Sequence, residues 1–160
     1  MTVKHFRRFA REWAMQFLFQ YDLTAIENNG EAIDDFLTQL GDSELFDAPT
    51  EAKLLRKADR TTRSIINGIL ENLPEIDKTI AEFSSKWTIE RMGIVDRNVM
   101  RVAIYEMLFC QNVPPVVSIN EAVEIGKIYG ADNTSSFING VLNAVMNTLD
   151  RPLREVAPKK

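Results

Sequence analysis

Apolar residues recur along this chain at intervals of three and four positions, which is the spacing of a helix that buries one face. The first such segment runs from Phe6 to about Leu23, and its apolar residues cluster on one side (Phe6, Phe9, Ala10, Trp13 and Phe17). The same spacing predicts further helices at about 30–40, 51–73, 75–85, 94–110, 118–129 and from 134 onward. We find no convincing alternation of the kind that predicts a strand. The pattern therefore predicts an all-α fold, a single compact domain of about seven helices.

Prolines and glycines indicate where these helices begin and end. Pro74 is expected to end the third helix and to begin the fourth, because proline is tolerated in a first turn. Ser118, with Glu121 three residues later, fits a capping box at the start of the sixth helix. Gly130 is expected to cap the C-terminal end of that helix.

The last helix carries two further predictions. Thr134 or Ser135 is expected to cap its start. The Asn139 and Gly140 pair could signal a hairpin, but no strand pattern flanks it, so we interpret it as helical. Gly140 would then permit close approach of another helix, at a cost of about 1 kcal/mol in helix propensity.

Length and composition place the chain among ordinary globular proteins. Its 160 residues amount to about one domain, with 45% hydrophobic and 26% charged residues. We expect one domain at residues 1–150 and a flexible basic tail at 151–160. No segment approaches the ~18 uninterrupted apolar residues of a membrane span, and the N-terminus lacks the features of a signal peptide. The sequence therefore predicts a cytoplasmic protein with no membrane partner.

The net charge of -4 conceals a strong segregation of charge. Lys4, Arg7, Arg8 and Arg11 lie at the N-terminus, whereas positions 12–52 contain no Lys or Arg and accumulate acidic residues. On a helical wheel the four cations fall opposite the aromatic residues. Several arginines on one face can form a salt-sensitive site for a polyanion. The alternative is the solvated outer face of an ordinary amphipathic helix.

A second candidate surface is the turn at residues 129–139. Tyr129 offers a ring on which a base could stack, and amide and hydroxyl side chains follow it. They lie at the start of a helix, where free backbone N–H groups can meet an anion. The alternative is an ordinary capped connection between two helices.

Catalytic chemistry is hard to assemble from this sequence. His5 is the only histidine, which excludes a histidine-rich metal site and disfavours a Ser-His or Cys-His pair. Cys110 is the only cysteine, so no internal disulfide can form, and its place in a core helix favours a structural role. No phosphate-binding loop or dinucleotide fingerprint occurs. We therefore expect a protein that is not an enzyme and that uses no cofactor or metal.

Four motifs occur in an order and spacing that resemble the NusB transcription antitermination family: "ARE-A-Q-LF", "DR-VMR-AIYEM", "P-V-SINEAVEI-K-YG" and "S-FINGVLN". The resemblance covers about Arg7 to Thr148, and the "INEAVEI…YG…SFINGVL" block is long enough to be specific. It implies a seven-helix domain that binds the boxA element of ribosomal RNA leader transcripts together with NusE, a ribosomal protein of the small subunit. It also implies that this complex joins other Nus factors on RNA polymerase, suppresses termination and supports ribosomal RNA synthesis.

The resemblance assigns residues to two surfaces. RNA would contact the basic start of the first helix and the turn before the last helix (Lys4, Arg7, Arg8, Arg11, Tyr129, Asn133, Phe137 and Asn139). NusE would contact a second set (Tyr21, Asp96, Arg97, Arg101 and Glu106). Three positions depart from the family pattern. Phe9 interrupts what is often a third consecutive arginine, Asn133 stands where an acidic residue is common, and Asn143 replaces a frequent aspartate.

Two other classes of function compete with a non-catalytic RNA-binding adaptor, which is the leading hypothesis. One is a helical scaffold whose acidic surface docks a basic partner without specific RNA binding. The other is a ribosomal RNA methyltransferase, because some of these enzymes carry a NusB-like N-terminal domain. The sequence after the last helix leaves no room for a catalytic domain, which disfavours the enzyme. Whether the free protein is a monomer or a homodimer stays open.

Overall fold

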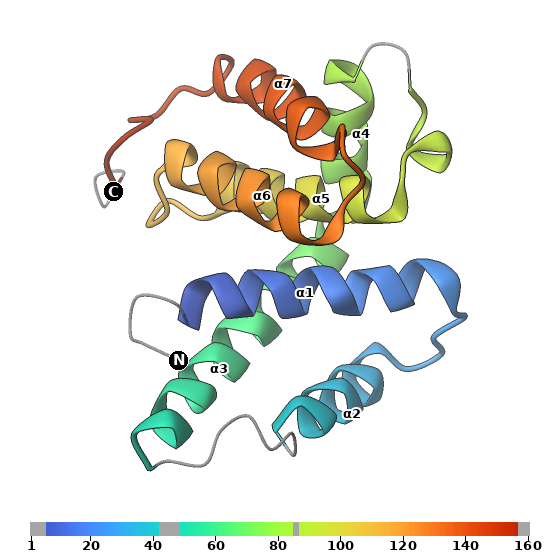
Figure 1. The fold of residues 1–160 in the computed structure, drawn as a ribbon, viewed down its shortest axis with the longest axis vertical. Coiled ribbons are helices and arrows are strands. Elements are labelled where there is room, and N and C mark those ends of the chain that lie inside the picture. Colours follow the sequence, from blue (N-terminus) through green and yellow to red (C-terminus); the bar gives the residue numbers. More distant parts are fainter. Residues whose placement is uncertain (1–5, 42–48, 85–86, 157–160) are drawn as a thin grey trace. The chain divides into compact units, whose positions relative to one another are not determined.

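The computed structural model describes residues 6–41, 49–84 and 87–156, with side chains from residue 52 in the second range. Within these ranges the chain forms seven α-helices, one short 3-10 helix and no strand (Figure 1). Their bounds are α1 Phe6–Leu23, α2 Asn29–Gly41, α3 Pro49–Glu71, α4 Leu73–Phe83, η1 Ile89–Arg91, α5 Ile94–Phe109, α6 Pro115–Tyr129 and α7 Thr134–Met146. The predicted all-α fold is confirmed. None of the described helices is long and apolar enough to cross a membrane.

Proline positions the starts of two helices. Pro74 lies in the first turn of α4, as predicted, and α3 ends three positions before it at Glu71. In α6, however, Pro115 is the first residue, so the helix begins three residues earlier than predicted. The capping box is therefore wrong: Ser118 lies inside the helix and is buried. Proline is favoured in a first turn because its backbone angle is already helical and its missing N–H would have had no partner there.

The chain divides into two compact units, residues 1–67 and 68–160, with the boundary inside α3. The first unit contains α1, α2 and most of α3. Its core includes Phe17 of α1, whose ring meets Phe36 of α2 edge-on at a centroid distance of 5.6 Å. An ion pair between Asp34 of α2 and Arg63 of α3 joins those two helices at the surface.

The second unit is organised around α5, which contacts α4, α6 and α7 (Figure 1). Nearly every side chain between Asn98 and Met107 is buried, as expected for a helix covered on several sides. Helices α6 and α7 also pack closely against each other. This contact passes over Gly126, where an added Cβ would lie 3.1 Å from the Ile138 side chain.

Two glycines near the end of α6 and in α7 differ from each other. Gly130 ends α6 as predicted, and its N–H donates to the carbonyl oxygen of Gly126 at 2.9 Å. A Cβ at Gly130 would lie only 2.5 Å from the Thr134 side chain, so the absence of a side chain is a packing requirement. Gly140 is exposed, and a Cβ there would meet nothing within 4 Å. The predicted close approach at Gly140 is therefore wrong, although the predicted helix there is confirmed.

Arg151 fastens the segment after α7 to the turn between α5 and α6. Its guanidinium donates hydrogen bonds to the carbonyl oxygens of Met107, Cys110, Gln111 and Val113 at 2.8–3.1 Å. Burial lowers the pKa of this guanidinium. The backbone carbonyl of Leu153 also accepts a hydrogen bond from the N–H of Val116 at 3.1 Å. Attachment to the second unit thus continues beyond the expected boundary at residue 150, while residues 157–160 lie outside the described ranges.

Candidate nucleic-acid interface

The basic start of α1 does not present all its cations to solvent. Arg7 is exposed and Arg8 is half-buried, whereas Arg11 is only 6% exposed. Lys4 and His5 lie outside the described residues. The prediction that these cations share one outward face is therefore wrong for Arg11. The Arg7 guanidinium lies 5.8 Å from the centroid of the Phe6 ring, an arrangement that permits a cation–π contact.

The buried side of α1 is wider than the aromatic residues alone predict. Arg11, Met15 and Leu18 are all buried, and they follow one another at helical intervals of four and three positions. By contrast, Phe6 and Phe9 are only half-buried. The helix thus buries a stripe that includes Arg11 and leaves part of its aromatic edge accessible.

A cavity of about 190 Å³ in the second unit brings together three of the predicted site residues. Asp96, Asn133 and Phe137 all line it. Asp96 is one of the residues on α5 that were predicted to contact NusE, whereas Asn133 and Phe137 were expected to contact RNA. The two predicted surfaces therefore meet at this cavity.

The same cavity is also lined by residues that sequence reasoning missed. Trp87 is 53% exposed and Arg91 is exposed, and both lie in the segment between α4 and α5. An exposed tryptophan close to an arginine is the kind of pair that stacks on or binds nucleic acid. The sequence signal was present in "KWTIER", where a large aromatic residue stands in a polar segment.

A hydrogen bond between the first turns of two helices shapes this cavity. The Thr134 hydroxyl at the start of α7 donates to Oδ1 of Asp96 at 2.8 Å. The helix α7 begins at Thr134, so Thr134 is its first residue and not its cap. The predicted cap is therefore wrong. The N-cap position belongs to Asn133, whose side chain makes no capping hydrogen bond. Its amide therefore lies at the cavity without being committed to the helix end.

Tyr129 and Asn139, two further predicted RNA contacts, do not line the cavity. Tyr129 is 38% exposed at the end of α6. Asn139 is exposed on α7, and its side-chain oxygen accepts a hydrogen bond from the Asn143 amide at 2.9 Å. Both are accessible, but Asn139 is oriented by Asn143.

The predicted NusE contacts divide by exposure. Tyr21 and Arg97 are half-buried, and an Arg97 N–H donates to the carbonyl oxygen of Ile89 in η1 at 3.2 Å. Arg101 and Glu106 are both buried. For these last two residues the burial disfavours a direct contact with a partner.

Arg101 instead forms a bidentate ion pair that joins α5 to α4. Its Nε and Nη2 donate to the two carboxylate oxygens of Asp77 at 2.8 and 2.9 Å. Its Nη1 donates to the side-chain oxygen of Asn98 at 2.9 Å. Paired in this way, Arg101 holds in place the helix that carries Asp96 and Arg97. No local sequence signal could have identified Asp77, which lies 24 positions away from Arg101.

Comparison with known proteins places these features in a family. The NusB family model matches residues 8–147. The transcription antitermination protein NusB of Pelotomaculum thermopropionicum is 43% identical over 149 residues, which cover 92% of this chain and 94% of that relative. Among solved structures, T. maritima NusB is 36% identical with a TM-score of 0.74, covering 89% of this chain and 91% of that one.

A further solved structure contains the antitermination factors NusB and NusE in complex with dsRNA. Its matching chain is 24% identical with a TM-score of 0.74, and the match covers 92% of this chain and 100% of that one. At this identity the likeness shows a shared fold. With the match of the family model across most of the sequence, the conclusion is direct: this chain belongs to the NusB family.

Proposed function

We propose that this chain is a transcription antitermination protein, a non-catalytic adaptor that binds RNA together with NusE. The observation that carries the proposal is its membership of the NusB family over residues 8–147. Curated relatives of nearly the same length are named transcription antitermination proteins. The RNA is the boxA element of ribosomal RNA transcripts, and binding it suppresses termination and supports ribosomal RNA synthesis.

RNA binding divides between phosphate contacts and base contacts. Arg7 and Arg8 at the start of α1 attract phosphates, which position the RNA without reading its sequence. Arg11 supports this helix from its buried side. Bases bind at the cavity of the second unit, where the Phe137 and Trp87 rings offer stacking surfaces.

Base preference depends on Asn133 at the same cavity. Its amide carries both hydrogen-bond donors and an acceptor, whereas the acidic residue common at this position in the family can only accept when ionised. Tyr129 and Asn139 extend the RNA-binding surface beyond the cavity. Lys4 adds a further cation before α1.

NusE binds Tyr21 in the first unit, and Asp96 and Arg97 in the second unit. Arg101 and Glu106 contribute from beneath, because both are buried. Asp96 is shared between the two surfaces: it lines the cavity and is held by Thr134. A partner bound at Asp96 therefore lies next to the bases bound at Asn133, which accounts for joint binding of NusE and RNA.

The remaining partners follow from this role. Other Nus factors and RNA polymerase are reached indirectly, through the complex with NusE and RNA. Transcription takes place in the bacterial cytoplasm, and we assign the protein to that compartment.

Fluorescence anisotropy with a labelled boxA RNA tests the proposal. Wild type is compared with Arg7→Ala/Arg8→Ala and with Phe137→Ala, each with and without NusE. We expect tighter binding with NusE. Phe137→Ala should lower RNA affinity about fivefold or more, since a stacked base contributes about 1–3 kcal/mol. Arg7→Ala/Arg8→Ala should lower it about tenfold or more, because two phosphate contacts are removed. Lys78→Ala, which removes an exposed cation from α4, is the matched control and is expected to bind normally.

Two results would contradict the proposal. Equal RNA affinity in wild type and Arg7→Ala/Arg8→Ala at low and high salt would exclude a role of α1 in RNA binding. If NusE still bound while no variant changed RNA affinity, the chain would be a protein-interaction scaffold.

Size-exclusion chromatography over a range of concentrations shows whether the free protein is a monomer or a homodimer.

A further inference from the structure

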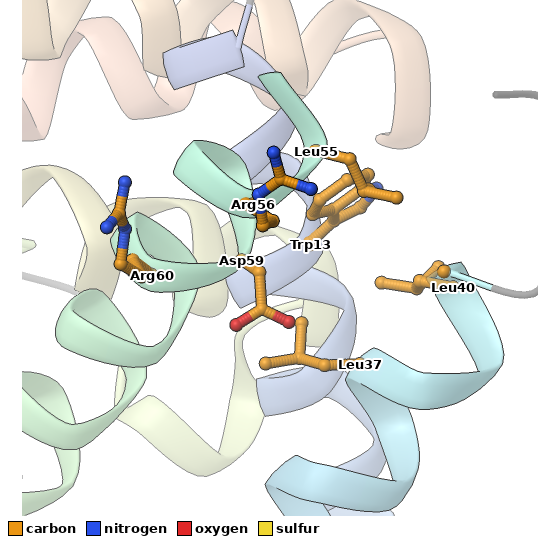
Figure 2. A pocket seen from close by; sticks show the side chains of 8 residues that line it. Trp13, Leu37, Leu40, Leu55, Arg56, Asp59 and Arg60 are labelled. Carbon is orange, nitrogen blue, oxygen red and sulfur yellow. The ribbon is translucent and has the colours of Figure 1, made fainter. Parts of the chain in front are cut away.

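The first unit contains a second, larger cavity that the proposed function does not use. It measures about 380 Å³ and is formed by α1, α2 and α3 (Figure 2). This volume lies within the range of about 300–1,000 Å³ that is typical of binding pockets. Its lining comprises Trp13, Leu37, Leu40, Gly41, Leu55, Arg56, Asp59 and Arg60.

The walls of this cavity are apolar. Trp13 and Leu37 are buried, and Leu40 and Leu55 are half-buried, so each helix contributes at least one apolar side chain (Figure 2). A bulky apolar side chain that entered the cavity would be removed from solvent and would contact all three helices. Such pockets, combining tryptophan and arginine, are where binding energy concentrates in protein interfaces.

The rim of the cavity is basic. Arg56 and Arg60 are exposed, lie four positions apart on α3, and form no ion pair within the described part of the chain. They belong to a stretch of α3, residues 52–63, that holds five basic residues and one acidic residue (Lys53, Arg56, Lys57, Arg60 and Arg63, with Asp59). In contrast, positions 12–52 of the same unit contain no Lys or Arg.

Among the described residues that line the cavity, Asp59 is the only carboxylate, and it is already paired. Asp59 accepts a hydrogen bond from Nε of Arg63 at 2.8 Å, and Arg63 also binds Asp34 of α2. Hydrogen bonds to Asp34 and Asp59 raise the pKa of Arg63. With Asp59 occupied in this way, Arg56 and Arg60 are the charges that the described part of the rim offers to a ligand.

We propose that this cavity is a docking site for an acidic amphipathic segment of a partner protein, one bulky apolar side chain of which enters the cavity while its carboxylates bind Arg56 and Arg60. The two arginines are separated by one helical turn, or about 6 Å along α3. A partner helix with acidic residues three or four positions apart presents carboxylates at a matching interval.

RNA fits the same cavity less well than an acidic segment does. Leucine walls offer no hydrogen-bonding groups to the edge of a base, and single-stranded RNA is recognised through such groups and through stacking. RNA binding at this cavity is therefore an outcome that the experiment must distinguish.

The test uses the full chain and three fluorescein-labelled probes in anisotropy titrations. The first is a helical peptide with one tryptophan, leucines one turn away and glutamates at four-residue intervals. The second has lysine in place of each glutamate, and the third is an oligouridine RNA. We expect the acidic peptide to bind wild type at micromolar concentrations, and the other two probes not to bind at these concentrations.

Variants then locate the binding site. Arg56→Glu/Arg60→Glu is expected to weaken the acidic peptide about tenfold or more, because it reverses both rim charges. Leu55→Ala, which leaves the charge unchanged, is expected to weaken it about fivefold or more through the lost wall. Lys53→Glu/Lys57→Glu, with the same change of charge on the same helix outside the lining, is expected to change affinity less than about threefold. Circular dichroism verifies that each variant keeps its helices.

Several results would overturn the proposal. One is that the acidic peptide does not bind wild type, and another is that the lysine peptide binds as tightly as the acidic one. A third is that Lys53→Glu/Lys57→Glu weakens the acidic peptide as much as Arg56→Glu/Arg60→Glu does. Loss of oligouridine binding in Arg56→Glu/Arg60→Glu would instead make this face an RNA surface. Conversion of a wild-type dimer into a monomer by that variant would make it a contact between two copies.

Discussion

Arg11 and Arg7 belong to one basic motif but lie in different environments. Arg7 is exposed, whereas Arg11 is buried on the same side of α1 as Met15 and Leu18. The helical wheel placed both arginines on an outward face, which is wrong for Arg11 because the buried stripe is wider than the aromatic residues alone predict. That width depends on which segments cover α1, and the local sequence does not contain this information. Exposure therefore separates the predicted RNA contacts, because Arg7 is accessible to a phosphate and Arg11 is not.

The ion pair of Arg101 is expected to contribute to the stability of the fold. Arg101 is 4% exposed and forms a bidentate pair with Asp77, whose side chain is 26% exposed. Arg101→Ala leaves Asp77 and Asn98 without this partner, so we expect the free energy of unfolding to fall by about 2–4 kcal/mol. Urea unfolding followed by circular dichroism measures the loss.

A double-mutant cycle separates the ion pair from simple loss of packing. Because Asp77→Ala removes the other half of the pair, the effect of the double variant should be smaller than the sum of the two single effects by about 1 kcal/mol or more. Additive effects would show that the pair does not hold α5 to α4.

At the scale of elements, most helices could be predicted from the sequence. The predicted first, second and fifth helices agree with α1, α2 and α5 to within one residue at each end, because apolar spacing and clear breaks coincide there. The start of α6 was wrong because Ser118 and Glu121 match a capping pattern, whereas Pro115 begins the helix. The role of Gly140 was wrong because close packing depends on neighbours that are distant in sequence.

The two glycines provide a matched prediction. Gly130→Ala is expected to destabilise the protein by about 1–3 kcal/mol, because the new methyl group must displace Thr134 and disturb its hydrogen bond to Asp96. Gly140→Ala is expected to stabilise it by about 0.5–1 kcal/mol, because the site is open and alanine favours a helix. Thermal unfolding of both variants beside wild type compares the two effects. Changes of the same sign would contradict the packing described for α7.

At the scale of the whole molecule, charge could be predicted better than organisation. The segregation of basic and acidic residues is visible in the sequence. The boundary between the two units falls within α3, where no proline, glycine-rich stretch or change of composition interrupts the helix before residue 68. The cavity that unites Asp96, Asn133 and Phe137 also depends on helices that the sequence separates. Local patterns therefore indicated these residues, but they did not predict that the three residues line one cavity.

The dependence of RNA binding on salt follows from the charge distribution. For a single strand, the logarithm of the binding constant changes with the logarithm of salt concentration by about 0.7 for each neutralised phosphate. Arg7→Ala/Arg8→Ala removes two proposed contacts and should therefore lower this slope by about 1.4. Anisotropy titrations between low and moderate salt measure the slope. An unchanged slope with weaker binding would assign these arginines to a role other than phosphate contact.

The hydrogen bonds of Arg151 join parts of the chain that a ribosome makes at different times. The four carbonyl groups that it binds belong to residues 38 to 44 positions earlier. At a translation rate of about 5–20 residues per second, they precede Arg151 by about two to nine seconds. During this interval those four carbonyl groups lack the guanidinium that binds them in the folded chain. The attachment of the segment after α7 to the turn between α5 and α6 therefore forms only after both of these helices have been synthesised, which makes it a late contact in the folding of the second unit.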